Sequence, residues 1–175
     1  GVGWVWRALH PESVKPPLSD LERDTPEVPG GTDFGAQKPN WTDCGDGFFC
    51  ADVQAPLDWA HPEGETISLR LVKHPATNGK PIGTLFVNPG GPGASGASFV
   101  RDRLDSAVGA PLKEEFDVVG WDPRGVGASS SVHCFDAAEM DEYLFGPSED
   151  EGYERGSAQW IAAAIDESRT FGEAC

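Results

Sequence analysis

Two stretches decide the fold: GTLFVNPGGPGASG, residues 83–96, and FDVVGWDPRGVGAS, residues 116–129. Each contains a short apolar run without polar alternation, which is typical of a strand covered on both faces. The segment between them, residues 97–115, repeats an apolar residue every four positions, and Gly109 and Pro111 are placed to end the helix early. Strand, helix and strand in this order predict two parallel strands joined by a crossover helix.

The flanking segments extend this unit on both sides. Residues 48–59, with Pro56 near their end, and residues 65–73, which alternate in polarity, predict an antiparallel pair of strands. Helical patterns follow at residues 135–145 and 156–171. The expected fold class is α/β, with an antiparallel start, then parallel strands and a crossover helix, and with a sheet that is incomplete in this chain.

Composition excludes several classes of protein. The 175 residues carry 13 Lys and Arg against 29 Asp and Glu, a formal net charge of −16, which argues against nucleic acid and anionic membranes as partners. No apolar run approaches the ~18 residues that cross a bilayer. No metal-ligand spacing accompanies the cysteines, so neither a metal nor a cofactor is expected.

Proline and charge divide the chain into two parts. Residues 1–40 are rich in proline and acidic residues and lack periodicity, which predicts an extended N-terminal arm whose start is anchored by Trp4 and Trp6. Residues 41–175 are expected to be the N-terminal part of a larger domain, because their predicted sheet is incomplete. Within them, the acidic run 148–154 is expected to be a solvated loop.

The four cysteines indicate an oxidising compartment. Cys44 and Cys50 flank a short glycine-containing loop and are expected to pair, which leaves Cys134 and Cys175 for a second disulfide. The expectation that follows is a secreted protein whose signal peptide has already been removed.

The first glycine loop, residues 88–96, follows a strand at the edge of the sheet where α/β proteins bind ligands. A glycine-rich turn there can aim backbone N–H groups at developing negative charge, as in an oxyanion hole. The expected donor is the N–H of Gly91, with Gly90 second, because Pro92 has none. Asn88, Pro92 and Gly93 are expected to support the loop.

A dinucleotide site is a competing interpretation of the same loop. The spacing of Gly91, Gly93 and Gly96 matches the dinucleotide fingerprint, and Asp122 ends the next strand where an acid would bind ribose. Pro92 weighs against this interpretation, since it removes an N–H where pyrophosphate needs a donor.

The second glycine loop, residues 122–129, is expected to brace the rim of the site. Gly125 and Gly127 indicate positive φ or close backbone approach. Asp122 and Arg124 are expected to fix the loop by pairing or by hydrogen bonds between the loops.

Together with WTDCGDGFFCADVQAPLDW (residues 41–59), the two glycine stretches resemble the proline iminopeptidase and tripeptidyl aminopeptidase group of secreted bacterial α/β-hydrolases. The resemblance covers residues 41–175. It implies a Ser-His-Asp peptidase that removes short peptides or proline from free N-termini, with an oxyanion hole partly in the GGPG segment. Many relatives carry His where this chain has Asn88. Esterases and epoxide hydrolases use similar loops, and a binding module that has lost its nucleophile is a third alternative.

The chain lacks the nucleophile that this mechanism needs. No serine stands in a Gly-x-Ser-x-Gly elbow, and the four histidines precede the place expected for a catalytic His. His61 and His74, each before a proline, are expected in loops. The triad is therefore expected beyond Cys175, in a C-terminal portion of the same precursor that could be a second chain.

Overall fold

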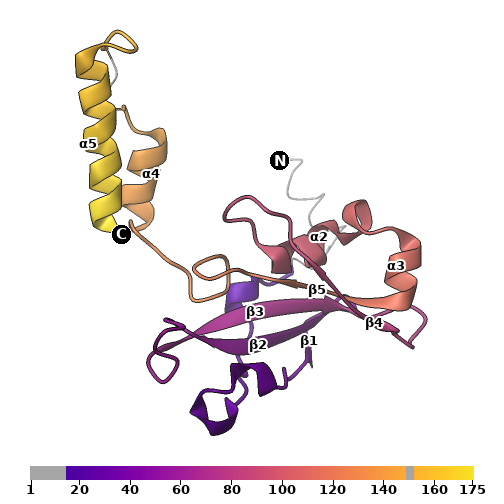
Figure 1. The fold of residues 1–175 in the computed structure, drawn as a ribbon. Helices are drawn as coiled ribbons and strands as arrows, with labels where there is room; N and C mark the ends of the chain where they lie inside the picture. The colour runs from indigo at the N-terminus through magenta and orange to yellow at the C-terminus, as the bar shows by residue number, and fades with distance from the viewer. Residues whose placement is uncertain (1–14, 149–151) are drawn as a thin grey trace, which may run out of the picture. The chain divides into compact units, whose positions relative to one another are not determined.

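A computed structural model describes residues 15–148 and 152–175 (Figure 1). The chain divides into two compact units, Gly1–Ser131 and Val132–Cys175, and each is described by itself. The expectations for Trp4, for Trp6 and for residues 149–151 of the acidic run lie outside the described residues.

The first unit is built on a mixed sheet, to which its described residues contribute five strands. In chain order these are β1 (Thr42–Asp43), β2 (Phe49–Pro56), β3 (Thr66–His74), β4 (Gly83–Val87) and β5 (Phe116–Trp121). Their order in the sheet is β1-β2-β3-β5-β4. β4 and β5 pair in parallel and the other neighbours pair antiparallel, so the predicted α/β class, antiparallel start and parallel pair are confirmed.

The strand directions bring the ends of three strands to one edge of the sheet. β3 runs antiparallel to both β2 and β5, so β2, β4 and β5 point the same way and their carboxyl ends share an edge. We call this the carboxyl edge. β3 ends at the opposite edge, where His74 pairs with Val118. His74 is thus the last residue of a strand, and its predicted loop position is wrong.

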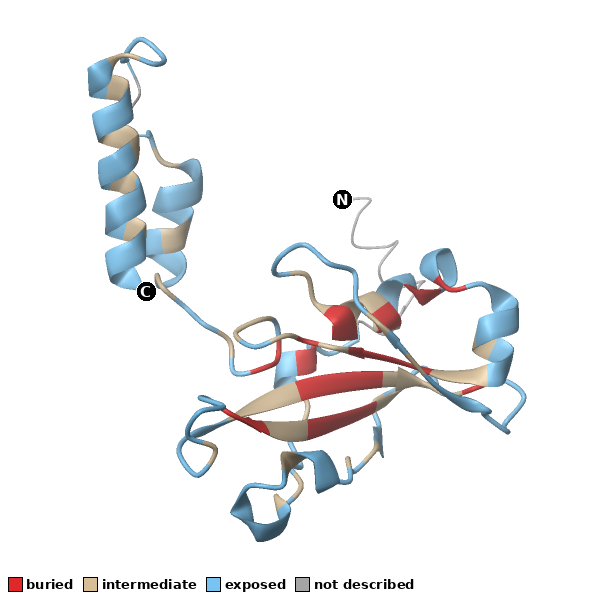
Figure 2. Cartoon of the chain, in the orientation of Figure 1, coloured by how far each residue is buried: buried red, intermediate tan, exposed pale blue. Residues whose placement is uncertain are grey.

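Two helices connect the parallel strands, because the predicted helix is interrupted at Gly109. α2 spans Gly96–Ala107, and α3 spans Ala110–Glu115 with Pro111 in its first turn. α2 contacts β3 and β5 and buries three apolar side chains against the sheet. The core includes Val72, Val100, Leu104 and Val118 (Figure 2).

A glycine pair lets the start of α2 lie directly on β5. A Cβ on Gly120 would stand 2.1 Å from the carbonyl oxygen of Gly96, and a Cβ on Gly96 would stand 2.3 Å from that of Trp121. Only glycine permits such an approach. This contact fixes the end of the first glycine loop beside the carboxyl end of β5.

β4 differs from the expectation that both parallel strands are central. β5 is central, with Val118, Val119 and Gly120 buried, but β4 is the edge strand among the described residues. The side chain of Phe86 is 61% exposed. Leu85 and Val87 pack against the core, while Thr84 and Phe86 point to the other face and are exposed, so the described residues cover β4 on one face only.

Residues 15–40 of the predicted arm contain three short 3-10 helices, η1 (Leu18–Asp20), η2 (Pro29–Gly31) and η3 (Phe34–Ala36). They contact the sheet: Leu18 lies in the core, and the side chain of Gln37 bonds to the backbone of Gln54 in β2. The division into an arm and a catalytic part stays a prediction.

The second unit is a helical hairpin. α4 (Ala137–Phe145) begins with a capping box between Asp136 and Glu139, and α5 (Ala158–Ala174) is capped by Ser157. Phe135, Tyr143 and Phe171 form an aromatic cluster with ring centroids 5.0–5.5 Å apart. Both predicted helices are confirmed. None of the helices seen in the described part of the chain is long and apolar enough to cross a membrane.

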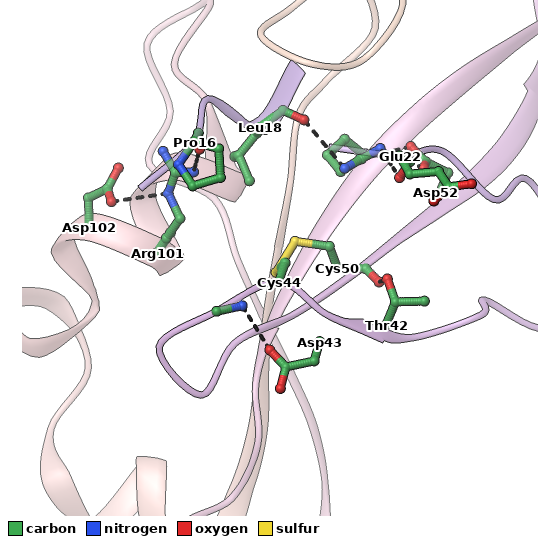
Figure 3. The surroundings of a disulfide bond; sticks show 12 residues. Pro16, Leu18, Glu22, Thr42, Asp43, Cys44, Cys50, Asp52, Arg101 and Asp102 are labelled. Atoms are coloured by element: carbon green, nitrogen blue, oxygen red, sulfur yellow. Dashed lines mark hydrogen bonds and ion pairs between the residues drawn. A yellow bond between two sulfur atoms is a disulfide. The ribbon is translucent and has the colours of Figure 1, made fainter. Parts of the chain in front are cut away.

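Both predicted disulfides are confirmed. Cys44–Cys50 joins the two sides of the turn between β1 and β2, with Cys50 in the core (Figure 3). Cys134–Cys175 ties the start of the hairpin unit to its end.

Candidate active site

The first glycine loop leaves β4 at the carboxyl edge, and its residues 88–93 are all exposed. Gly90, Gly91 and Gly93 have φ of +80°, +132° and +92°, in the region that favours glycine. The glycine-rich composition is therefore required by the path of the backbone, and the path keeps side chains away from the loop's amides.

The two predicted donors in this loop differ in availability. The Gly90 N–H donates to Oδ1 of Asn88 at 2.8 Å, which closes a local turn. The Gly91 N–H has no acceptor among the residues that the structure describes. A Cβ on Gly91 would stand 2.9 Å from the nitrogen of Gly93 and 3.0 Å from that of Ala94. In the described structure the Gly90 N–H is therefore already engaged, whereas the Gly91 N–H is not, and their role as donors to a ligand stays a prediction.

Asp122 joins the two glycine loops. Its side chain is buried, with 1% of the residue exposed. Oδ1 accepts hydrogen bonds from the Ser95 hydroxyl and, at 3.1 Å, from the Ala97 N–H, while Oδ2 accepts the Ala128 N–H at 2.8 Å. Ser95 in turn caps α2 by accepting the Ser98 N–H at 2.9 Å. One carboxylate therefore holds the base of the first loop to the second.

The second loop closes around this carboxylate. A Cβ on Gly127 would stand 2.3 Å from Oδ2 of Asp122, and φ at Gly127 is +56°. Ser129 is fully buried, and its hydroxyl accepts the Arg70 N–H at 2.7 Å. Both ends of the loop, at Asp122 and at Ala128 and Ser129, are thus buried, while Arg124 and Gly127 between them are exposed.

Arg124 does not pair with Asp122 within the described ranges; each binds backbone groups elsewhere. Its guanidinium donates to the carbonyls of Pro56 at 2.7 Å and Leu57 at 3.2 Å, and lies 5.9 Å from the ring centroid of Trp59. The idea that the two side chains pair with each other is wrong, because a buried Asp122 is already saturated by neutral donors. Arg124 instead ties the second loop to the carboxyl end of β2.

Three further residues near the site were missed at the level of sequence. Arg70 and Asp52 form a bidentate ion pair at 2.8 and 3.0 Å, each with 1% of its surface exposed. Arg23 donates to the carbonyl of Ala128 in the second loop. A charged residue at a strand position that faces the core is a usable signal, but the alternation in residues 65–73 does not reveal which face is buried.

The buried position of Asp122 also bears on the dinucleotide interpretation. Both carboxylate oxygens accept hydrogen bonds from the protein, so the acid that would bind a ribose hydroxyl is already engaged. This arrangement weighs against a nucleotide at the first glycine loop.

The groups with shifted pKa lie away from the loops. Burial and, after it, the positive charge of Lys113 lower the pKa of His74 below 6.5. A hydrogen bond from Lys113, with its charge, lowers the pKa of Asp105. His74 stands at the edge opposite the glycine loops, so neither shift identifies a general acid or base at the candidate site.

Comparison with known proteins gives the context for this geometry. No family model matches the chain. Carboxylesterase B of Mycobacterium tuberculosis is 41% identical over 102 residues, which cover 58% of this chain and 19% of that protein. Serine protease Hip1 of the same species is 33% identical over 155 residues, which cover 79% of this chain and 27% of that protein. Tripeptidyl aminopeptidase of Streptomyces coelicolor is 38% identical over 110 residues, covering 58% and 20%.

The chain thus spans 19 to 27% of the length of these curated relatives. All three names describe hydrolases, and two describe peptidases. They confirm the resemblance carried by the two glycine loops: this chain is related by sequence to bacterial serine hydrolases of the peptidase group.

Proposed function

We propose that this chain supplies the oxyanion-hole loop of a secreted serine peptidase that acts on peptides with free N-termini. The observation that carries the proposal is the Gly91 N–H, which is exposed at the carboxyl edge and has no acceptor in the described structure. The buried Asp122 bracing the loop from below supports it. The two disulfides are consistent with an oxidising compartment.

The Gly91 N–H would act when negative charge develops on the carbonyl oxygen of the substrate. In acyl transfer a serine attacks that carbonyl while a histidine takes the serine proton, and the oxyanion needs donors already in place. Glycine at 91 leaves no Cβ between the amide and the substrate, and its rigid base limits reorganisation during the reaction. One such donor contributes roughly 10²–10³ in kcat.

The remaining catalytic groups are proposed to lie on polypeptide other than these residues. The chain has no Gly-x-Ser-x-Gly sequence to provide the nucleophile. Among the strands of the described residues β4 lies at the end of the sheet, so a further strand could pair with its outer edge and extend the sheet. We propose that a C-terminal portion of the same precursor, in the same or a second chain, brings that strand and the triad.

The first test uses the complete natural polypeptide carrying Gly91→Val. The valine Cβ would meet the nitrogens of Gly93 and Ala94, so the amide must move, while the exposed loop lets the rest of the protein fold. We expect labelling by a fluorophosphonate to slow by about 10²–10³ with a nearly unchanged melting temperature. Gly79→Val is the control, because Gly79 also has positive φ (+69°) but precedes β4 in the turn at the opposite edge.

The outcome separates the roles of the loop. Folded Gly91→Val protein that labels at the wild-type rate would contradict the oxyanion assignment. Absence of any labelled serine in the wild-type polypeptide would contradict the hydrolase proposal itself and would favour a binding module.

A second candidate function is that of an esterase, since the 41% identity is to a carboxylesterase. Turnover of a free tripeptide anilide, of the same anilide with a blocked N-terminus and of 4-nitrophenyl acetate distinguishes the two. The peptidase proposal expects the free anilide to have the highest kcat/KM. A preference for the ester, with both anilides inert, would replace the peptidase by the esterase.

A further inference from the structure

Residues 16–24, here called the N-terminal strap, contact α2 and the core that α2 shares with the sheet. Leu18 at the start of η1 is 6% exposed and belongs to the same cluster as Val72, Val100 and Cys50. Figure 3 shows Pro16, Leu18 and Glu22 passing beside the Cys44–Cys50 disulfide. The strap is therefore a fixed part of the first unit.

A buried guanidinium in the sheet holds the backbone of the strap. Arg70 of β3 is locked by its bidentate pair with Asp52, and its remaining N–H groups donate to the carbonyls of Leu18 and Glu22, each at 3.4 Å. Because both charges are buried and paired, this link has one well-defined geometry.

From that anchored backbone, Arg23 reaches the second glycine loop. Its guanidinium donates to the carbonyl of Ala128 and to the hydroxyl of Ser68, and lies 3.7 Å from Oδ1 of Asp52. Ala128 is 4% exposed, and its N–H donates a hydrogen bond to the Asp122 carboxylate. Residue 128 is thus held at its carbonyl by the strap and at its amide by the brace of the first loop.

We propose that Arg23 is a positioning residue for the oxyanion loop. It fixes the carbonyl of Ala128, the amide of residue 128 fixes Asp122, and Asp122 fixes Ser95 and Ala97 at the base of the loop that carries Gly91. This inference rests on the proposed function and adds the N-terminal strap to the machinery of the same site.

Arg101 offers a matched control for a merely structural role. It donates to the carbonyl of Pro16 at 2.9 Å, so it also ties the strap to the unit through an arginine-to-carbonyl bond. Its link goes to α2 and does not involve the second glycine loop. Loss of either bond loosens the strap, but only loss of Arg23 releases Ala128.

The experiment compares Arg23→Ala, Arg23→Lys and Arg101→Ala in the complete natural polypeptide. Three readouts are needed: fluorophosphonate labelling, kcat and KM for 4-nitrophenyl acetate, and hydrogen exchange of the peptide spanning residues 88–98. We expect Arg23→Ala to lower kcat about 10-fold with KM nearly unchanged and to speed exchange in that peptide. Arg23→Lys should restore part of kcat, since one donor remains, while Arg101→Ala should keep the wild-type kcat and exchange.

Each result decides between the alternatives. Equal loss of kcat in the two alanine variants, or none in Arg23→Ala, would overturn the positioning role even if the wild-type protein labels normally. Failure of the wild-type protein to label or to turn over ester would instead overturn the proposed function. If Arg23→Ala melts too low for kinetics, its exchange is measured at a lower temperature, and unchanged exchange of residues 88–98 in Arg23→Ala there would also overturn the positioning role.

Discussion

The two glycine loops at the carboxyl edge have similar compositions and opposite environments. In the first, residues 88–93 are exposed and the Gly91 N–H has no acceptor within the described residues. In the second, Asp122, Ala128 and Ser129 are buried. The Asp122 carboxylate accepts hydrogen bonds from the N–H groups of Ala97 and Ala128, and the Ser129 hydroxyl accepts one from the Arg70 N–H. Glycine leaves a backbone amide exposed in the first loop, whereas in the second loop it allows close packing against Asp122.

From this difference we expect the two loops to have separate tasks. Residues 88–93 of the first loop are all exposed, whereas Asp122 in the second loop is buried and accepts hydrogen bonds from both loops. Substitutions in the second loop should therefore act first on stability, and substitutions in the first loop should act first on chemistry.

The largest effect on stability is expected for Asp122→Ala. The change leaves the buried N–H groups of Ala97 and Ala128 without their acceptor, so the free energy of unfolding should fall by about 2–5 kcal/mol. Urea denaturation of the complete polypeptide measures it. A loss below about 1 kcal/mol would show that water or another group replaces the carboxylate, and would break the comparison.

A comparison of Gly127→Ala with Gly90→Ala tests the difference between a closely packed glycine and an exposed one. Both have positive φ, but a Cβ at 127 meets Oδ2 of Asp122 at 2.3 Å, and a Cβ at 90 meets nothing within 4 Å. Gly127→Ala should cost about 3 kcal/mol from overpacking and strain together, and Gly90→Ala about 1–2 kcal/mol from strain alone. Equal melting temperatures for the two variants would contradict the packed character of the second loop.

Asn88→Ala should be the mildest loop variant. Its side chain accepts only the Gly90 N–H, in an exposed turn, so the loss in unfolding free energy should be less than about 1 kcal/mol. Denaturation in urea compared with Asp122→Ala provides the measurement. A loss as large as that of Asp122→Ala would mean that the first loop, too, is needed for the fold.

At the sheet edge opposite the glycine loops, we expect the free energy of unfolding to depend on pH through His74. Burial lowers the pKa of His74 below 6.5, so the folded state resists protonation there. The contribution of a neutral His74 is complete above pH 6.5 and is lost as the pH falls through the lowered pKa. His74→Gln should flatten this part of the stability profile. His61→Gln, at a side chain 73% exposed, is the control, and a profile changed equally by both variants would contradict the assignment.

Local patterns were sufficient to predict β2 to β5, α2, the two hairpin helices and both disulfides, but not the short strand β1 or α3 as a separate helix. They could not show that β4 lies at the edge, because an apolar run does not state which strands pair with it. Alternation in residues 65–73 divides them into two faces without revealing that Arg70 and Val72 face the core. The bonds of Asp122 to Ser95 and of Arg23 to Ala128 join residues far apart in sequence, which only the folded chain brings together.

The most direct test of the account is a crystal structure of the complete natural polypeptide inactivated by a fluorophosphonate. We expect a phosphonylated serine outside this chain's 175 residues, with the phosphonyl oxygen about 2.7–3.1 Å from the nitrogen of Gly91. A phosphonyl oxygen that is bound by other amides, with Gly91 turned away from it, would contradict the central claim.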